Sequence, residues 1–273
     1  MPAFLARRLR LVRPRVAAAG LCRASASELS TYRRVPRFIL EEKCFDIATW
    51  NSEPGVCSPT LTYPGLELVH QEPSIWVVHD FLSSSECERI VEKARGGLER
   101  STSFDSQEVD DRTSEVTAVS QRELPTPTSK ILRLFSGFCS DPRQLEAMQV
   151  IRYSEGQCFA PHLDALDGPF TSSGFVDSAR LATIFVYLVD THRGGETVFP
   201  RLGLRIRPTR GMAVVHSPTR VDTDGSYIAD RRCLHEGCPA IDEKWLLASW
   251  VWATPVTAGW GDESISKLGP DVI

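Results

Sequence analysis

The spacing of apolar residues predicts helices early in the folded part of the chain. Residues 74–81 (SIWVVHDF) read as a short strand, and residues 83–95 (SSSECERIVEKAR) as an amphipathic helix. A serine can cap the start of this helix, and two glycines follow its end. Residues 127–139 (PTSKILRLFSGFC) predict a second helix. The apolar faces of the two helices consist of Cys87, Ile90, Val91 and Ala94, and of Ile131, Leu134, Phe135 and Phe138.

After residue 147 the pattern changes to short β-rich segments separated by glycine and proline. The segments are MQVIRYS, RLATIFVYLVD, GLRIRP, GMAVVHSP and KWLLASWVWA. Regularly spaced strands of this kind are typical of a barrel or jelly roll. We therefore expect an α+β fold in which N-terminal helices pack on a β-domain that covers about residues 147–254.

The pattern also divides the chain into regions. Residues 28–73 mix proline, glycine and serine with few periodic segments, which is typical of a linker or of a strap over the domain. Residues 74–255 form the predicted folded domain, and residues 256–273 form a C-terminal tail.

The charge distribution indicates where the chain is directed in the cell. Residues 1–27 hold six arginines, no lysine and no acid. An arginine-, alanine- and serine-rich segment without acids is typical of a transit peptide, so we expect an organelle and favour the mitochondrion. The alternative is a secretory signal that leads to the endoplasmic reticulum, with VAAAGLC as its short apolar segment.

Charge and hydropathy also limit the partners. Without those six arginines the rest of the chain carries a net charge of −10, which argues against nucleic acid as a partner. No apolar run reaches about 18 residues, so no transmembrane anchor is predicted. The eight cysteines include no C-x-x-C pair, which excludes a zinc ribbon, and they leave disulfide pairing and the oligomeric state open.

A candidate metal site starts from His162 and Asp164, two residues apart in CFAPHLDAL. On a strand such residues point to the same face, so both can reach one ion. A second histidine from another strand would complete a two-histidine, one-carboxylate triad for non-haem Fe(II). The downstream histidines are His192, His216 and His235. We prefer His235 because Lys244 follows it at the start of an apolar strand, where a buried ammonium needs an anion such as a dicarboxylate.

The motifs around these residues resemble the catalytic domain of prolyl 4-hydroxylases, in the Fe(II)/2-oxoglutarate dioxygenase superfamily. The segments that carry the resemblance are VIRYSEGQCFAPHLD, RLATIFVYLVDTHRGGETVFP, RPTRGMAVV and LHEGCPAIDEKWLLASWVW, together with DFLSSSECERIVEKA and DDRTSE upstream. They cover roughly residues 74–254 in order. The resemblance implies a double-stranded β-helix and a hydroxylase that couples oxidation of peptidyl proline to conversion of 2-oxoglutarate into succinate and CO2.

The resemblance also implies roles for individual residues. His162, Asp164 and His235 would bind Fe(II), and no catalytic group is expected beyond these ligands. Lys244, Tyr153 and Thr197 would bind 2-oxoglutarate, L-ascorbate would keep the iron reduced, and a proline-containing protein or peptide would contact Arg180, Trp250 and Phe159.

Three positions depart from the family pattern. Phe159 replaces a usual tyrosine, Trp252 stands where relatives often carry histidine, and His216 replaces an apolar residue. These departures put the substrate in doubt, so one alternative is the same oxygenase chemistry on another side chain or a small metabolite. A second alternative is a binding module without turnover. The sequence also leaves undecided whether proline would be attacked at C4 or C3.

Overall fold

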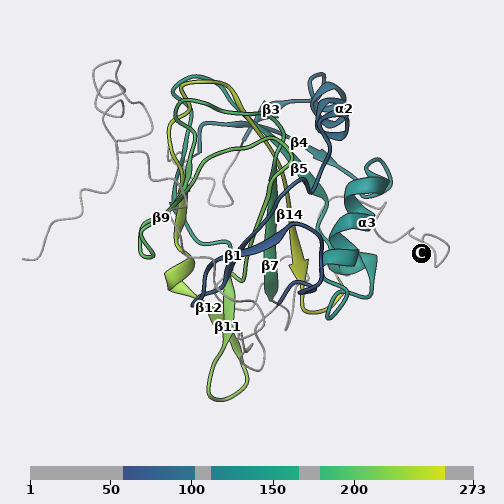
Figure 1. Cartoon of the computed structure of the whole chain (residues 1–273), viewed down its shortest axis with the longest axis vertical. Coiled ribbons are helices and arrows are strands. Elements are labelled where there is room, and N and C mark those ends of the chain that lie inside the picture. The colour runs from purple at the N-terminus through teal and green to yellow at the C-terminus, as the bar shows by residue number, and fades with distance from the viewer. Residues whose placement is uncertain (1–57, 102–111, 166–178, 256–273) are drawn as a thin grey trace, which may run out of the picture.

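The computed structural model describes residues 58–101, 112–165 and 179–255. In this part of the chain two β-sheets face each other, and helices cover the outer side of the larger one (Figure 1). The expected α+β class and the double-stranded β-helix are confirmed.

The larger sheet has eight antiparallel strands in the order β1-β2-β10-β7-β14-β5-β4-β3. Its longest strand, β14, pairs with β5 on one side and β7 on the other, so Lys244 lies opposite Tyr153. The strands are β1 (Leu66–His70), β2 (Ile75–Val78), β3 (Glu99–Arg100), β4 (Glu115–Val119), β5 (Met148–Tyr153), β7 (Arg180–Tyr187), β10 (Ala213–His216) and β14 (Lys244–Trp252).

The smaller sheet has four strands in the order β6-β13-β8-β9, and a separate hairpin joins β11 to β12. The strands are β6 (Phe159–His162), β8 (Thr197–Phe199), β9 (Leu204–Ile206), β11 (Thr219–Val221), β12 (Tyr227–Ala229) and β13 (His235–Gly237). The last five of these strands have only three residues each, too few to show a period of two, and of these five the sequence pattern predicted only the one around β9.

The helical layer consists of α2 (Ser84–Ala94) and α3 (Pro125–Leu134), with the 3-10 turns η3 (Pro142–Gln144) and η4 (Arg231–Cys233). Helix α2 matches its prediction, and Ser83 and Glu86 form a capping box at its start. Helix α3 begins at Pro125 rather than residue 127 and ends before residue 139. A proline fits the first turn because its missing N–H has no partner there, and Phe135 leaves the helical conformation at the end.

Alternation along the strands separates two cores. On β14, Trp245, Leu247 and Val251 pack toward the helices, whereas Leu246 and Ala248 face the smaller sheet. Lys244 has the same parity as Leu246, so the strand period itself directs this lysine between the two sheets.

The region predicted as a linker or strap contributes to the sheet. Strand β1 lies within residues 28–73 and pairs with β2, so the folded unit begins before residue 74. The predicted targeting segment (1–27) and tail (256–273) lie outside the described residues. In the described ranges, the structure contains no helix of the length and apolarity needed to cross a membrane.

Candidate active site

Two neighbouring strands bring the predicted ligands together. Strand β6 ends at His162 and β13 begins at His235, and the two residues lie directly opposite each other. Asp164 follows two residues after β6. Its Oδ1 atom is 3.7 Å from His162 Nε2, and its Oδ2 atom is 3.6 Å from His235 Nε2. One ligand atom from each residue lies within 4.8 Å of the other two, which is a spacing that one metal ion can bridge.

Backbone carbonyls orient both imidazoles. His162 Nδ1 lies 2.8 Å from the Ala160 carbonyl, and His235 Nδ1 lies 3.1 Å from the Cys233 carbonyl. Since a carbonyl only accepts, each Nδ1 carries the hydrogen and each Nε2 lone pair remains free for a metal. Phe159 stacks on His162 with 3.6 Å between ring centroids, and this contact further restricts the ring.

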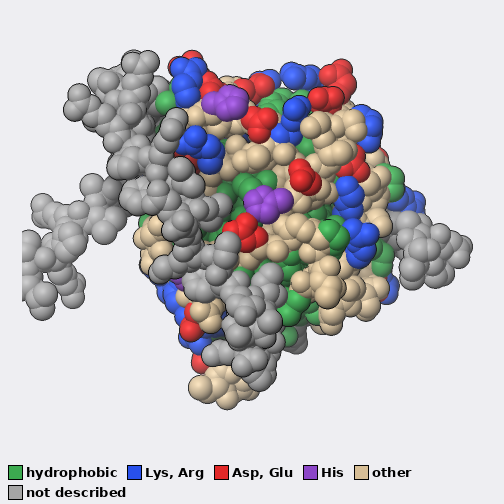
Figure 2. Space-filling view, viewed as in Figure 1, with side chains coloured by type: hydrophobic (Ala, Val, Ile, Leu, Met, Phe, Trp, Pro, Cys, Tyr) green, Lys and Arg blue, Asp and Glu red, His purple; other side chains and the backbone are tan. Residues whose placement is uncertain are grey.

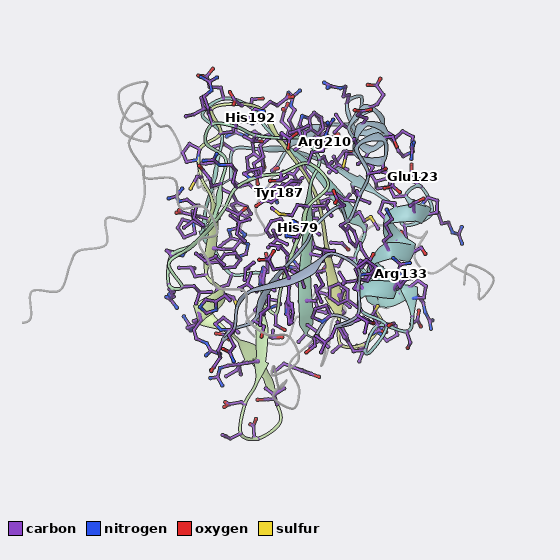
Figure 3. The ribbon with its side chains drawn as sticks, in the orientation of Figure 1. His79, Glu123, Arg133, Tyr187, His192 and Arg210 are labelled. Atoms are coloured by element: carbon purple, nitrogen blue, oxygen red, sulfur yellow. The ribbon has the colours of Figure 1, made fainter. Side chains whose placement is uncertain are left out.

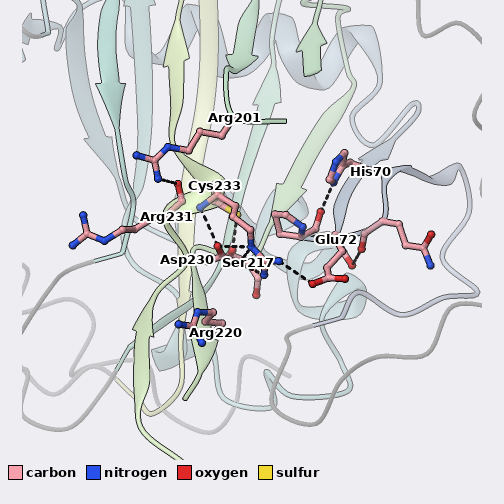
Figure 4. Close-up of polar contacts among 12 residues, drawn as sticks. His70, Glu72, Arg201, Ser217, Arg220, Asp230, Arg231 and Cys233 are labelled. Carbon is pink, nitrogen blue, oxygen red and sulfur yellow. Dashed lines mark hydrogen bonds and ion pairs between the residues drawn. The ribbon is translucent and has the colours of Figure 1, made fainter. Parts of the chain in front are cut away.

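The turn before His235 is held by its own polar contacts (Figure 4). Asp230 caps η4 and accepts from the backbone and guanidinium of Arg232. Arg232 also donates to Glu72, at 2.8 Å, in the connection between β1 and β2. These contacts fix the backbone that supplies the Cys233 carbonyl, and thereby the orientation of His235.

The electrostatics of the cluster favour the metal-binding protonation states. Burial lowers the pKa of His235 to about 3, and burial also lowers the pKa of His162. Burial alone would raise the pKa of Asp164, but the imidazoles of His235, His216 and His162 outweigh it and hold this pKa well below its usual value. Neutral imidazoles beside an ionised carboxylate are the forms that bind a metal.

Lys244 is a buried cation in the same pocket. It is 2% exposed, and its Nζ atom lies 5.2 Å from the ring centroid of Tyr153 and 5.7 Å from that of Tyr187. Burial lowers its pKa to about 8, and no described residue forms an ion pair with it. Gly195 makes room for the aliphatic stem, because a Cβ atom there would lie 3.2 Å from Lys244 Cδ.

A pocket with an empty volume of about 520 Å³, including its solvent-open part, connects the histidines to Lys244. Its lining combines apolar walls with a few converging polar groups, which is typical of a site for a small organic ligand. Of the predicted site residues, Phe159, Trp250, Tyr153 and Thr197 lie in its wall. The remaining wall consists of Arg112, Ile151, Thr183, Phe185, Glu236, Gly237, Leu246 and Ala248.

Arg180, the third predicted substrate contact, is not in the pocket wall. It is 8% exposed and donates two hydrogen bonds to Glu146, at 2.7 and 2.9 Å. Its third contact is a 3.1 Å bond to the backbone carbonyl of Asp164, and its guanidinium lies 4.2 Å from the ring centroid of Trp250. In the structure Arg180 therefore packs behind the pocket wall, where it contacts Glu146, Asp164 and Trp250, instead of facing a ligand.

Sequence reasoning missed several contributors. Thr183 donates to Asp164 Oδ2 at 2.9 Å, and Tyr187 donates to Thr197 Oγ1 at 2.8 Å. Strand parity could have identified both, because Thr183 and Tyr187 alternate along β7 with residues that face the helices. His216 also lies beside Asp164, whereas His192 is exposed on the loop before β8 (Figure 3). The preference for His235 over His192 thus agrees with the geometry.

Charges of both signs are mixed on one face of the described residues. On the face shown in Figure 2, basic and acidic side chains alternate, and the described residues form no continuous basic stripe there. Several arginines are paired with acids, among them Arg193 with Asp242 and Arg210 with Glu88. Such paired charges contribute little to phosphate binding.

Comparisons with known proteins agree with this geometry. Residues 148–252 match the family model of the 2OG-Fe(II) oxygenase superfamily. Probable prolyl 4-hydroxylase 3 of Arabidopsis thaliana is 30% identical over 210 residues, and prolyl 4-hydroxylase 1 of the same plant is 32% identical over 208 residues. Each alignment covers 68% of this chain and 71% of the relative.

A solved structure shows the same fold. The viral collagen prolyl hydroxylase of Paramecium bursaria Chlorella virus-1, crystallised as a 2OG complex, superposes with a TM-score of 0.52 at 27% identity. The match covers 66% of this chain and 96% of the viral one. The fold, the triad and these relatives together show that the chain is an Fe(II)- and 2-oxoglutarate-dependent dioxygenase of the prolyl 4-hydroxylase family.

Proposed function

We propose that this chain hydroxylates proline in a protein or peptide and couples this reaction to the breakdown of 2-oxoglutarate. The observation that carries the proposal is the buried Lys244, without a described anion, in the same pocket as the His162, Asp164 and His235 cluster. The similarity to proteins named prolyl 4-hydroxylases supports proline as the target.

His162, Asp164 and His235 would hold the Fe(II) ion. Two neutral nitrogens and one carboxylate suit this metal and leave further coordination positions open. Fe(II) held there would supply the redox chemistry by which O2 reacts with 2-oxoglutarate, with one oxygen atom going to succinate beside released CO2 and the other to the substrate carbon as a hydroxyl group. The chain contributes by holding the ligands, positioning the co-substrate and limiting access of water.

The polar end of the pocket suits the distal carboxylate of 2-oxoglutarate. Lys244 supplies the charge, and a charge-assisted hydrogen bond would offset the cost of its burial. Thr197 Oγ1 already accepts the hydroxyl hydrogen of Tyr187, so its own hydrogen is free to donate to a carboxylate. Tyr153, which interacts with Arg112 and Ser114, would close this end of the pocket.

The substrate would approach along Phe159 and Trp250, whose rings form apolar walls near the histidines. A proline ring has no charge and fits such walls through its carbon surface. Arg180, whose guanidinium lies over the Trp250 ring, would position this wall without contacting the peptide itself. L-ascorbate is proposed as the reductant that keeps the iron in its Fe(II) state.

The reaction can be tested with the full chain, Fe(II), ascorbate, 2-oxoglutarate and a panel of proline-rich peptides. We expect succinate, and a peptide mass increase of about 16 Da on proline, the mass of one oxygen atom. Succinate formation that survives in the His162→Ala, His235→Ala double variant would overturn the triad assignment. Succinate without proline oxidation across the panel would overturn the substrate and favour another side chain or a small metabolite. No succinate at all from a folded chain would favour a binding module.

We further propose that residues 1–27 direct the chain to the mitochondrion. The support is the composition of this segment, six arginines without an acid. Residues 1–40 fused to a fluorescent reporter should colocalise with a mitochondrial marker. Entry of the reporter into the secretory pathway would favour the endoplasmic reticulum and overturn the proposal.

A further inference from the structure

His216 on β10 is a buried polar side chain that the proposed function does not use. It is 0% exposed, and neither ring nitrogen has a hydrogen-bond partner among the described residues. Phe199 meets the ring edge-on at 5.4 Å between centroids. Leaving a buried nitrogen unpaired costs about 1–3 kcal/mol. We therefore expect a hydrogen-bond partner for the His216 ring close by.

The nearest carboxylate belongs to Asp164. His216 Nε2 lies 3.4 Å from Asp164 Oδ2, and Thr183 Oγ1 donates to the same oxygen at 2.9 Å. His216 and Thr183 are direct partners in the pairing of β10 with β7. One cross-strand pair of the larger sheet therefore presents two donors to a single oxygen of Asp164.

We propose that His216 is a positioning residue for the metal centre: it donates Nε2–H to Asp164 Oδ2 and, with Thr183, occupies both lone pairs of that oxygen. This leaves Oδ1, the oxygen beside His162, as the ligand. The proposal rests on the proposed function of the triad. The 3.4 Å separation is a few tenths of an ångström longer than the usual N–H···O limit of about 3.2 Å, so a small ring adjustment completes the bond.

The geometry separates this role from that of a fourth ligand. In the described part of the chain, the set of possible ligand atoms within 4.8 Å of one another contains His162, Asp164 and His235, and His216 is outside it. A carboxylate restricted to one oxygen occupies one coordination position. The positions needed by a chelating co-substrate and O2 then stay open, as the triad requires.

Co(II) titration of the full chain tests the proposal without turnover. Affinity is measured by competition with a chelating dye, and the visible Co(II) spectrum reports coordination. His216→Phe keeps a ring but removes the donor, and we expect 10- to 100-fold weaker binding, as for other groups that orient a metal ligand, with an altered spectrum. His216→Gln keeps a donor, and we expect binding within about threefold of the unmodified chain.

The control removes a histidine elsewhere. His79 is exposed and contacts Glu67, so His79→Gln should leave affinity and spectrum unchanged. Thr183→Val removes the other donor to Oδ2 and should alter the spectrum in the same direction as His216→Phe. If His216→Phe does not fold, the Co(II) spectrum of Thr183→Val still shows whether a donor to Oδ2 controls how Asp164 binds the metal.

Several outcomes would overturn the proposal. One is a folded His216→Phe chain that binds Co(II) within twofold of the unmodified chain with the same spectrum. Another is equal loss in the Phe and Gln variants, which would indicate a packing role. If His162→Ala binds Co(II) as well as the unmodified chain, the triad itself fails and this proposal fails with it. If His162→Ala loses binding while His216→Phe does not, only the positioning role is wrong.

Discussion

His162 and His235 face each other across the β6–β13 strand pair, with 4.3 Å between their ring centroids. The two residues are 73 positions apart in the chain, so the antiparallel register of a short sheet creates the candidate metal site. Phe159 stacks on one imidazole and Phe199 lies against the other, with 5.3 Å between the Phe199 and His235 centroids. Both imidazoles are therefore packed against a phenylalanine ring before any ligand arrives, and we expect single substitutions to have separable effects.

Replacing Lys244 should abolish 2-oxoglutarate binding and stabilise the ligand-free chain. Burial lowers its pKa from 10.5 to about 8, which corresponds to a cost of up to about 3 kcal/mol at pH 7. We expect Lys244→Met to raise the unfolding free energy of the ligand-free chain by about 1–3 kcal/mol, in urea titrations, and to abolish 2-oxoglutarate binding. Lys93→Met, on an exposed ion pair with Glu123, should change stability by less than about 0.5 kcal/mol. A Lys244→Met chain that is less stable than the unmodified ligand-free chain would contradict this prediction.

Thr197 should act on the co-substrate and not on the metal. Thr197→Val removes the hydroxyl proposed to donate to a carboxylate, and we expect 2-oxoglutarate affinity to fall about 10-fold, as for loss of a hydrogen bond to a charged group. Metal affinity should not change, because Thr197 is not among the ligand atoms. Calorimetric titration with each ligand in turn separates the two. Equal weakening of both would indicate a general distortion of the pocket.

Arg180 offers a test of whether it supports the fold or contacts the substrate directly. Its two hydrogen bonds to the buried Glu146 predict that Arg180→Met leaves a buried carboxylate without its cationic partner, held only by the Trp252 indole N–H, at a cost of about 3–5 kcal/mol. Thermal unfolding of Arg180→Met and of the Arg180→Met, Glu146→Met double variant provides the measurement. The double variant should recover part of the loss. A chain with unchanged stability and a raised peptide KM would instead make Arg180 a substrate contact.

The ligand-free chain should lose stability in mild acid. His235 takes up a proton below pH 6.5 when unfolded but only near pH 3 when folded, so acid favours the unfolded state. Between pH 7 and pH 5 this amounts to about 2 kcal/mol, and the lowered pKa of His162 acts in the same direction. The stabilisation from ionised Asp164 persists in this window, because it is lost only below 3.8. Urea unfolding of the chelator-treated chain at both pH values should show a shallower loss for His235→Gln. A stability that is independent of pH would contradict the cited shifts.

Much of the site could be predicted because each of its parts carries a local sequence signal. The His-x-Asp pair, the later histidine and the lysine each stand in a recognisable motif, and strand parity directs them to one side. Contacts between segments far apart in the chain could not be predicted from the sequence. The Glu146–Arg180 pair joins the segment before β5 to β7, and β1 lies in a segment rich in turn residues. Three-residue strands such as β8 and β13 also carry too few positions to reveal a period.

His216 illustrates the same limit. Its position in an apolar strand marks it as unusual, but only the register of β10 with β7 shows that it lies beside Thr183 and Asp164. A pattern identifies which residue is out of place, whereas the fold identifies what that residue contacts.

We propose that one pocket holds Fe(II) between His162, Asp164 and His235 and a dicarboxylate against Lys244. Both parts can be tested together by the visible absorption that Fe(II) acquires when 2-oxoglutarate chelates it, recorded without O2 in the full chain. We expect a band that needs both components and is lost in His235→Ala, and that needs far more 2-oxoglutarate in Lys244→Met. A folded, unmodified chain that gives no band at saturating Fe(II) and 2-oxoglutarate, or a band that persists in His235→Ala, would contradict it.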